Sequence, residues 1–154
     1  MEHPPSIIPI HILLADDDRD DRYFFEKALK LISFKTHLTI VEDGAKLMSY
    51  LKANSAKLPD VLFLDYNMPR KNGFECLSEI KSNPLLKALP VIIYSTYVHE
   101  DVADMLYTRG AHYYIRKVEL PELQKIIQLA LTRLVDTRFA RPARKEFILS
   151  LLEA

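Results

Sequence analysis

The sequence predicts an α/β protein built on a doubly wound, five-stranded parallel sheet. Short apolar runs of strand length alternate five times with longer segments whose apolar residues recur at helical spacing. The runs are almost wholly apolar, which is typical of strands that helices cover on both faces. Right-handed crossovers leave few topologies for such a chain, and the flavodoxin-like order 2-1-3-4-5 is the natural choice for five strands.

Turn residues bound the apolar runs that we interpret as strands. Asp43–Gly44 closes the second run, Pro59 introduces the third, Pro90 begins the fourth and Gly110 precedes the fifth. In chain order, the expected strands cover residues 10–15, 38–41, 60–65, 90–94 and 111–115.

Amphipathic stripes and end signals identify the helices. In the first, Phe24, Phe25 and Ala28 fall on one face, Asn83–Pro84 ends the third, and Pro121 suits the first turn of the fifth. In chain order, the expected helices cover residues 19–32, 45–53, 73–81, 98–109 and 121–135. Residues 10–135 are therefore expected to form one domain.

The chain continues beyond that domain as an extra C-terminal segment, residues 136–154. Its apolar residues Phe147, Ile148, Leu151 and Leu152 would share one face of a helix. We expect a short helix docked on its own domain; a contact with a partner or a second copy is the alternative interpretation.

Composition excludes several classes of protein. The 21 basic and 21 acidic residues give a formal net charge of zero, so the basic excess of a nucleic-acid-binding surface is missing. No apolar run reaches membrane-spanning length, and the first residues lack the features of a signal peptide. Cys76 is the only cysteine, so no intrachain disulfide can form, and we expect a cytoplasmic location.

Polar residues follow four of the expected strands at the point where each strand ends. Asp16 and Asp17 follow the first strand, Asp65 ends the third, Ser95 follows the fourth and Lys117 follows the fifth. The carboxyl ends of strands in an open α/β sheet converge on one crevice, so these side chains should meet there. Three neighbouring carboxylates repel one another unless a cation lies between them, and all-oxygen ligands suit magnesium.

A calcium-binding loop or a helix start could also account for acidic residues in this part of the chain. An EF-hand requires Gly and Glu at positions that Asp21 and Lys27 occupy here, so it is excluded. Asp18, Asp20 and Asp21 suit the start of a helix, where negative charge is favourable. Neither role fits Asp65. A carboxylate beside magnesium can act as a nucleophile toward phosphorus, with Lys117 and Ser95 around the transferred group.

These motifs resemble the receiver domain of two-component response regulators. The similarity spans about residues 10–135 and rests on five motifs in order. They are Ile12–Asp18, Val41–Gly44, Asp60–Pro69 with Asn72–Gly73, Pro90–Ser95 and Gly110–Lys117. One position departs from the pattern: Val118 stands where the family usually has a proline after a cis peptide bond, and we expect the Lys117–Val118 bond to be trans.

The resemblance implies a role for each matching residue. Asp65 would be the phosphoacceptor, and Asp16, Asp17, Asp65 and the backbone carbonyl of Asn67 would bind Mg²⁺ or Mn²⁺. The remaining implied roles are a switch hydroxyl, a phosphate-pairing lysine and an aromatic that moves inward with the hydroxyl, at Ser95, Lys117 and Tyr114 respectively. Tyr97, two positions after Ser95, is a further candidate that could overhang the phosphoryl group and slow the attack of water.

The resemblance also implies a function. The protein would be a stand-alone response regulator, not an enzyme beyond its own phosphoryl transfer and autodephosphorylation. Its partners would be a sensor histidine kinase or histidine phosphotransfer protein and a downstream protein, with a possible homodimer through the fourth and fifth helices. The alternatives are a degenerate receiver that binds without phosphorylation and, less favoured, a magnesium-dependent aspartyl-phosphate phosphatase, which would need an Asp where Asn67 stands.

Overall fold

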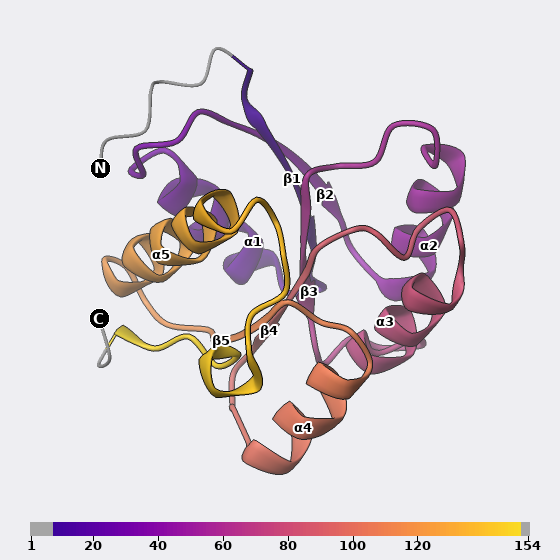
Figure 1. The fold of residues 1–154 in the computed structure, drawn as a ribbon. Coiled ribbons are helices and arrows are strands. Elements are labelled where there is room, and N and C mark those ends of the chain that lie inside the picture. The colour runs from indigo at the N-terminus through magenta and orange to yellow at the C-terminus, as the bar shows by residue number, and fades with distance from the viewer. Residues whose placement is uncertain (1–7, 152–154) are drawn as a thin grey trace.

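The computed structural model describes residues 8–151 and has the expected architecture (Figure 1). Five parallel strands form one sheet in the order β2-β1-β3-β4-β5. The strands are β1 (Ile10–Ala15), β2 (Thr36–Val41), β3 (Val61–Asp65), β4 (Val91–Ser95) and β5 (Tyr113–Arg116). The helices are α1 (Arg19–Leu29), α2 (Gly44–Ala53), α3 (Gly73–Ser82), α4 (Glu100–Thr108), α5 (Glu122–Asp136) and the short 3₁₀ turn η1 (Arg144–Glu146).

The sheet lies between two helical layers, each with its own apolar core. α1 and α5 cover one face, and α2, α3 and α4 cover the other (Figure 1). β3 and β4 are buried along their whole length, which explains why their sequences are almost continuously apolar. The apolar face of α5 is buried in this domain, so it serves the core, and Cys76 is fully buried on α3 as a small apolar residue.

Side-chain caps fix the starts of three helices. Asp18 accepts a hydrogen bond from the Asp21 N–H at α1, and Asp43 accepts one from the Lys46 N–H at α2. At α3, Asn72 and Glu75 form a reciprocal capping box. These caps set where each helix begins after the preceding strand, and therefore how close its first turn lies to the strand end.

The first helix differs from the expectation in its extent and in one of its faces. α1 ends at Leu29, because the chain turns toward β2, which begins at Thr36 opposite Ile10. Phe24 was expected on the inner face, but 48% of its surface is exposed, while Phe25 and Ala28 are fully buried. An apolar residue next to a buried stripe therefore remains on the surface.

The C-terminal segment does not form the helix that we expected. In the described part of the chain after α5, the 3₁₀ turn Arg144–Glu146 is followed by Ile148, which forms a parallel bridge with Tyr114 on β5. The free edge of β5 offers backbone hydrogen-bonding groups, and pairing with them competes with helix formation. Leu152 lies outside the described residues.

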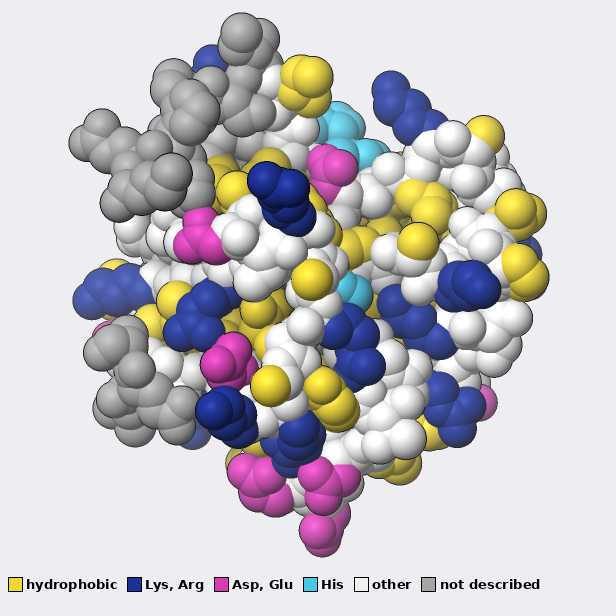
Figure 2. All heavy atoms as spheres, viewed as in Figure 1, with side chains coloured by type: hydrophobic (Ala, Val, Ile, Leu, Met, Phe, Trp, Pro, Cys, Tyr) yellow, Lys and Arg dark blue, Asp and Glu magenta, His cyan; other side chains and the backbone are white. Residues whose placement is uncertain are grey.

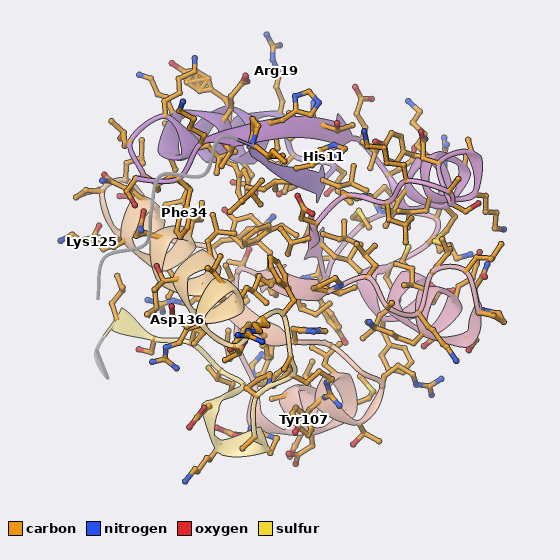
Figure 3. The ribbon with its side chains drawn as sticks, turned by 45° about the horizontal axis from the view of Figure 1, so that its top comes forward. His11, Arg19, Phe34, Tyr107, Lys125 and Asp136 are labelled. Atoms are coloured by element: carbon orange, nitrogen blue, oxygen red, sulfur yellow. The ribbon has the colours of Figure 1, made fainter. Side chains whose placement is uncertain are left out.

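The same segment lies beside α4. Tyr107 on α4 donates a hydrogen bond from its hydroxyl to the Pro142 carbonyl (2.8 Å), and it lies next to this part of the chain in Figure 3. Figure 2 shows acidic side chains gathered at the end of the molecule that α4 forms, with basic side chains next to them. Among the described residues, no helix is long and apolar enough to cross a membrane.

Candidate functional site

The site lies at the end of the sheet where four parallel strands finish. Asp16 follows the last residue of β1, and Asp65 is the last residue of β3. In the register of the sheet, Asp65 pairs with Tyr94 of β4, and Ser95 pairs with Arg116 of β5, immediately before Lys117. The expected convergence of Asp16, Asp65, Ser95 and Lys117 at one end of the sheet is therefore what the structure shows.

Three carboxylates meet at this end. Asp16, Asp17 and Asp65 each have one oxygen in a group whose members all lie within 4.8 Å of one another. Asp16 is fully buried and Asp65 is 3% exposed, whereas Asp17 faces solvent. This arrangement of hard oxygen ligands, open on the Asp17 side, suits a divalent cation that keeps part of its water.

Lys117 is the positive charge within this acidic group. Its Nζ lies 2.8 Å from Asp21 Oδ2, 3.0 Å from Asp16 Oδ2 and 3.4 Å from Asp65 Oδ2. The ammonium also lies 5.1 Å from the centroid of the Tyr94 ring, within the range of a cation–π contact. A single lysine therefore contacts three carboxylates from different segments of the chain.

The buried acids of this site are less readily ionised than free carboxylic acids. Burial raises the pKa of Asp65 to about 8, with further contributions from the charge of Asp16 and the hydrogen bond with Asp17. Lys117 and the Asn67 N–H, which donates to Asp65 Oδ1 at 3.1 Å, act in the opposite direction. Burial also raises the pKa of Asp16, although the Asp18 N–H and Lys117 oppose the shift. A bound cation would therefore favour the ionised form of these acids.

The same charges act on Lys117 in the opposite sense. Burial alone would lower its pKa, but the hydrogen bond with Asp21 and the charges of Asp16 and Asp65 raise the pKa above its ordinary value. Lys117 is therefore charged at any physiological pH. Asp16 Oδ2, which lies beside it, meets no partner with good hydrogen-bond geometry among the described residues, so this buried oxygen retains capacity for another cation.

Asp21 is a site residue that the sequence interpretation missed. Its position in the first turn of α1 was attributed to favourable charge at a helix start, and that role holds for Asp18, which caps the helix. The structure adds a salt bridge from Asp21 to Lys117. The sequence carried no signal for this contact, because Asp17 and the extended cap residue Asp18 precede the helix, and helical spacing does not relate them to Asp21.

The loop after Asp65 depends on Gly73. A Cβ on Gly73 would lie 2.6 Å from the Asp65 carbonyl oxygen and 2.8 Å from the Tyr66 Cα. The Gly73 N–H donates to the Tyr66 carbonyl at 2.9 Å, which closes the loop. Only glycine allows the start of α3 to approach the acidic strand end this closely.

Ser95 at the end of β4 and Tyr114 in β5 are both buried. Ser95 is 2% exposed and Tyr114 is 1% exposed. The Tyr114 hydroxyl donates to the Tyr97 carbonyl at 3.1 Å, so it is not the exposed phenol of an ordinary surface strand. Burial raises the pKa of Tyr114, and the backbone of His99 and the Ser95 hydroxyl partly offset the shift.

Residues 12–128 match the family model of the response regulator receiver domain. The chain belongs to this family. It is 33% identical over 131 residues to the response regulator Rcp1 of Synechocystis, covering 82% of this chain and 86% of Rcp1. It is 28% identical to the two-component response regulator ARR6 of Arabidopsis thaliana, covering 89% and 77% of the two chains.

Solved receiver structures agree with this assignment. The Mn²⁺-bound form of Rcp1 superposes with a TM-score of 0.74 at 32% identity, covering 88% of this chain and all of that one. The phosphorylated cyanobacterial phytochrome response regulator RcpA gives the same values. Receivers act with histidine kinases or phosphotransfer proteins and are in general not enzymes in the usual sense. The matches favour neither alternative function, the phosphatase or the module that binds without phosphorylation.

The loop after Lys117 differs from the receiver pattern in the expected way. Within residues 8–151 the cis peptide bonds are confined to Leu120–Pro121, so the Lys117–Val118 bond is trans. The Lys117 N–H donates to the Ser95 carbonyl at 2.7 Å, which ties the start of this loop to the end of β4. Lys117 therefore reaches the acids without a cis bond at position 118.

A surface cavity adjoins the receiver site. Its volume is about 500 Å³, and it lies between the first turn of α1 and the loop that leads into α5. Lys117, Asp21 and Tyr94 contribute to its lining beside the apolar side chains of Phe24 and Leu123. The Phe24 ring, which is partly exposed on α1, forms part of the wall of this cavity.

Proposed function

We propose that this receiver accepts a phosphoryl group on Asp65 from a sensor histidine kinase or a histidine phosphotransfer protein, and then signals through contact with another protein. The observation that supports this most strongly is the position of Asp65, which is buried at the end of β3 with Lys117 Nζ 3.4 Å from its Oδ2. A buried carboxylate beside a fixed cation and two further acids is suited to phosphoryl transfer.

The transfer uses residues of this chain at each step. A carboxylate oxygen of Asp65 bonds to phosphorus while the P–N bond of the donor phosphohistidine breaks, and the electron pair of that bond goes to the imidazole nitrogen. Lys117 supplies positive charge to the transferred oxygens, and the Ser95 hydroxyl offers a hydrogen-bond donor. Tyr114 lies inward behind Ser95 and follows its movement.

Asp16, Asp17, Asp65 and the backbone carbonyl of Asn67 are the residues that would hold Mg²⁺, with Mn²⁺ as a substitute. The buried Asp16 Oδ2 and the raised pKa of Asp65 support this assignment, since both call for positive charge. When bound, the ion neutralises charge on the carboxylates and the phosphoryl oxygens.

The phosphodonor would dock beside the site. The cavity next to Lys117 is lined by Phe24, which is 48% exposed, and Tyr23 beside it is 51% exposed. Exposed aromatic side chains next to a reactive group are typical of a protein-binding surface. We therefore place the donor histidine at the α1 side of the site.

The output surface would lie around α4, β5 and α5, where Ser95 and Tyr114 transmit the change at Asp65. A homodimer through α4 and α5 would have to use their outer surfaces, because the apolar face of α5 is buried in this domain. Autodephosphorylation would end the signal, and access of water past Tyr97 would set its rate.

Intact-mass measurement tests the proposal. Incubation with Mg²⁺ and acetyl phosphate should add one labile phosphoryl group of about 80 Da. The Asp65→Asn variant and removal of Mg²⁺ should each abolish the gain. Asp60→Asn is the matched control, since Asp60 is an exposed acid just before the start of β3 and should leave the gain unchanged. A wild-type protein that gains no mass would refute the proposal.

A further inference from the structure

The C-terminal segment, residues 140–151, is bonded to β5 at the residue that the receiver switch uses. The Tyr114 N–H donates to the Phe147 carbonyl at 3.0 Å, and the Leu149 N–H donates to the Tyr114 carbonyl at 3.1 Å. Both backbone groups of Tyr114 on the outer edge of the sheet are therefore occupied. The segment takes the place of a further strand beside β5.

Phe147 brings the segment into contact with the Tyr114 side chain. Its ring is fully buried, 6.2 Å from the Tyr114 ring and 5.3 Å from the Tyr107 ring of α4, the latter in an edge-to-face arrangement. Phe147 belongs to the same core cluster as Tyr114, whereas Leu149 belongs to the cluster under α1 and α5. The segment therefore closes both cores at the edge of the sheet.

Polar contacts hold the segment to α4. Arg144 pairs with Glu100 at 2.8 Å and with Asp104 at 2.9 Å, at the acidic end of the molecule seen in Figure 2. Arg141 donates to the backbone carbonyls of Tyr107 and Ala111, and its guanidinium lies over the Tyr107 ring. Most of these contacts are exposed and individually weak, so the buried Phe147 ring is the main source of stabilisation.

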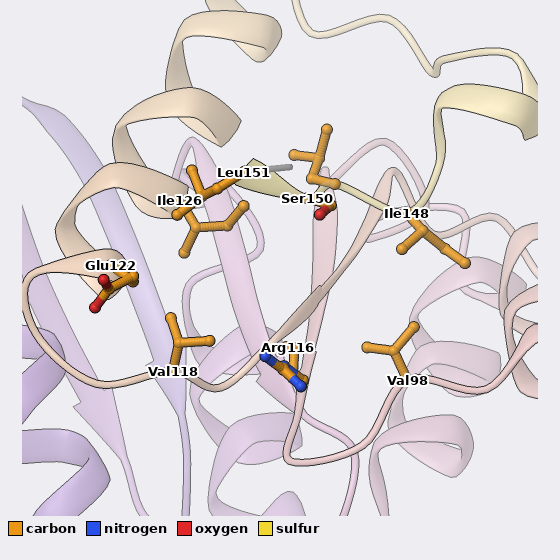
Figure 4. A pocket seen from close by; sticks show the side chains of 9 residues that line it. Val98, Arg116, Val118, Glu122, Ile126, Ile148, Ser150 and Leu151 are labelled. Atoms are coloured by element: carbon orange, nitrogen blue, oxygen red, sulfur yellow. The ribbon is translucent and has the colours of Figure 1, made fainter. Parts of the chain in front are cut away.

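The part of the segment after Phe147 packs less completely. Ile148, Ser150 and Leu151 face a cavity of about 440 Å³, across which lie Arg116 and Ile126 (Figure 4). A side chain that borders a cavity loses packing contacts on that side, so this part is held less firmly than a core helix. The segment can therefore respond to a change at Tyr114 without unfolding of the domain.

We propose that Phe147 is a positioning residue for the receiver switch: it holds Tyr114 in its inward position and couples docking of residues 140–151 to the state of Asp65. Residues 147–149 cover the edge of β5 at Tyr114. A Tyr114 ring that moves outward past this edge therefore has to displace them. The inward ring reaches the Tyr97 carbonyl, in the loop that follows Ser95. The inference rests on the proposed function, in which Tyr114 lies inward when Asp65 is phosphorylated.

The coupling is reciprocal by thermodynamic necessity. If docking of the segment favours the inward Tyr114, the inward Tyr114 favours docking by the same factor. Phosphorylation of Asp65, which favours the inward ring in the proposed function, must then favour docking as well. The segment would then be held more tightly in the phosphorylated protein and would be freed more often in the unphosphorylated one.

The positioning role can be tested without phosphorylation by fluorine NMR of protein that contains fluorotyrosine, with the Tyr114 signal assigned by Tyr114→Phe. Phe147→Ala should shift or broaden that signal, and Phe147→Leu should restore it in part. Lys145→Ala, an exposed change in the same segment, should leave it unchanged. Arg144→Ala loosens the segment from the surface and should shift the signal in the same direction by a smaller amount, which keeps the test valid even if Phe147→Ala folds poorly. A Tyr114 signal that none of these variants moves would overturn the proposal.

Hydrogen exchange tests the coupling in the full chain with Mg²⁺ and acetyl phosphate, while intact mass records phosphorylation in the same samples. Exchange at the Tyr114 and Leu149 amides should slow by at least about fivefold when Asp65 is phosphorylated, and Phe147→Ala should abolish the slowing. Unchanged or faster exchange in protein shown by mass to be phosphorylated would overturn the coupling. No phosphorylation at all would overturn the proposed function and the coupling with it, while the fluorine signal would still decide the positioning role.

Discussion

At the scale of single residues, Lys117 determines the charge state of the site. Its ammonium pairs with the buried carboxylates of Asp16 and Asp65 and with Asp21, all within 3.4 Å. Removing one partner from a buried charged group leaves the others uncompensated. Asp16 and Asp65 would respond by taking up protons, because burial already raises the pKa of both. A protonated Asp65 is a poor nucleophile.

Replacement of Lys117 by an uncharged side chain of similar length should therefore impair phosphorylation. We expect Lys117→Met to slow the gain of a phosphoryl group from acetyl phosphate by at least about tenfold, because removal of one electrostatic donor from an active site typically costs about a hundredfold or more. The rate is followed by intact mass. Lys125→Met, an exposed lysine on α5, is the matched control. Equal rates for the two variants would show that Lys117 does not act on the transferred group.

Tyr97 governs the lifetime of the phosphoryl group in our hypothesis. Its side chain is 69% exposed, and its ring centroid lies 6.3 Å from that of His99. The ring is therefore not packed into the core. We expect Tyr97→Ala to speed dephosphorylation several-fold, measured as the decay of the phosphorylated mass after removal of the donor. Leu85→Ala, which also removes an exposed apolar side chain, should leave the decay unchanged. An unaltered decay in Tyr97→Ala would disprove the hypothesis.

At the scale of elements, the strands and helices were predicted correctly where the local residue pattern and the tertiary packing favour the same structure. Apolar runs such as Val61–Leu64 can be satisfied only in the middle of a covered sheet, and the acids at their ends followed from that. The C-terminal segment was mispredicted because the spacing of Phe147, Ile148 and Leu151 suits a helix, while the open edge of β5 decides the outcome. Asp21 was missed because a helix start accounts for its charge, and only the position of Lys117 reveals its second role.

His112, immediately before β5, links pH to stability. Its Nε2–H donates to the Phe139 carbonyl at 3.0 Å, just after α5, and its Nδ1 is buried without a partner in the described structure. Burial lowers the pKa of His112 to about 4, so the folded state prefers the neutral ring. The stabilisation is complete above the unfolded pKa of about 6.5 and is lost as the pH falls from there toward 4.

We therefore expect the free energy of unfolding to fall by about 3 kcal/mol between pH 6.5 and pH 4 through this residue. Urea unfolding of the wild type and His112→Gln across that range measures the difference. Glutamine keeps a donor for the Phe139 carbonyl but does not titrate. If both proteins lose stability equally, His112 is not the group responsible.

Two substitutions in α3 should have opposite effects on stability. Gly73→Ala places a Cβ against the backbone of Asp65 and Tyr66, so the domain should lose about 2 kcal/mol of stability or more and phosphorylation should slow. Ser78→Ala, in the same helix, removes a buried hydroxyl that has no partner among the described residues and should leave stability unchanged or raise it by up to about 1 kcal/mol. Urea unfolding measures both, and a harmless Gly73→Ala would contradict the close approach of α3.

At the scale of the whole molecule, the site lies at the end of the sheet where its parallel strands finish, between the two apolar cores. β1 and β3 lie next to each other in the middle of the sheet, so each of their acids is supported by apolar layers on both faces. The same burial that fixes the geometry raises the pKa of Asp16 and Asp65. The fold thus creates a need for a cation at the place where the transferred phosphoryl group would also require one.

Cation binding should consequently be linked to the release of a proton. The pKa of Asp65 is raised to about 8, so its proton competes with the metal below that pH. We expect the affinity for Mn²⁺ to rise with pH, by up to about tenfold per unit, and to level off near pH 8. Electron paramagnetic resonance of free Mn²⁺ measures the affinity, and thermal unfolding should shift upward with it. Asp65→Asn should weaken binding and flatten the pH dependence, whereas Asp60→Asn should retain both. An affinity that is flat between about pH 6 and pH 8 in the wild type would mean that Asp65 is already ionised, with Lys117 alone holding its charge.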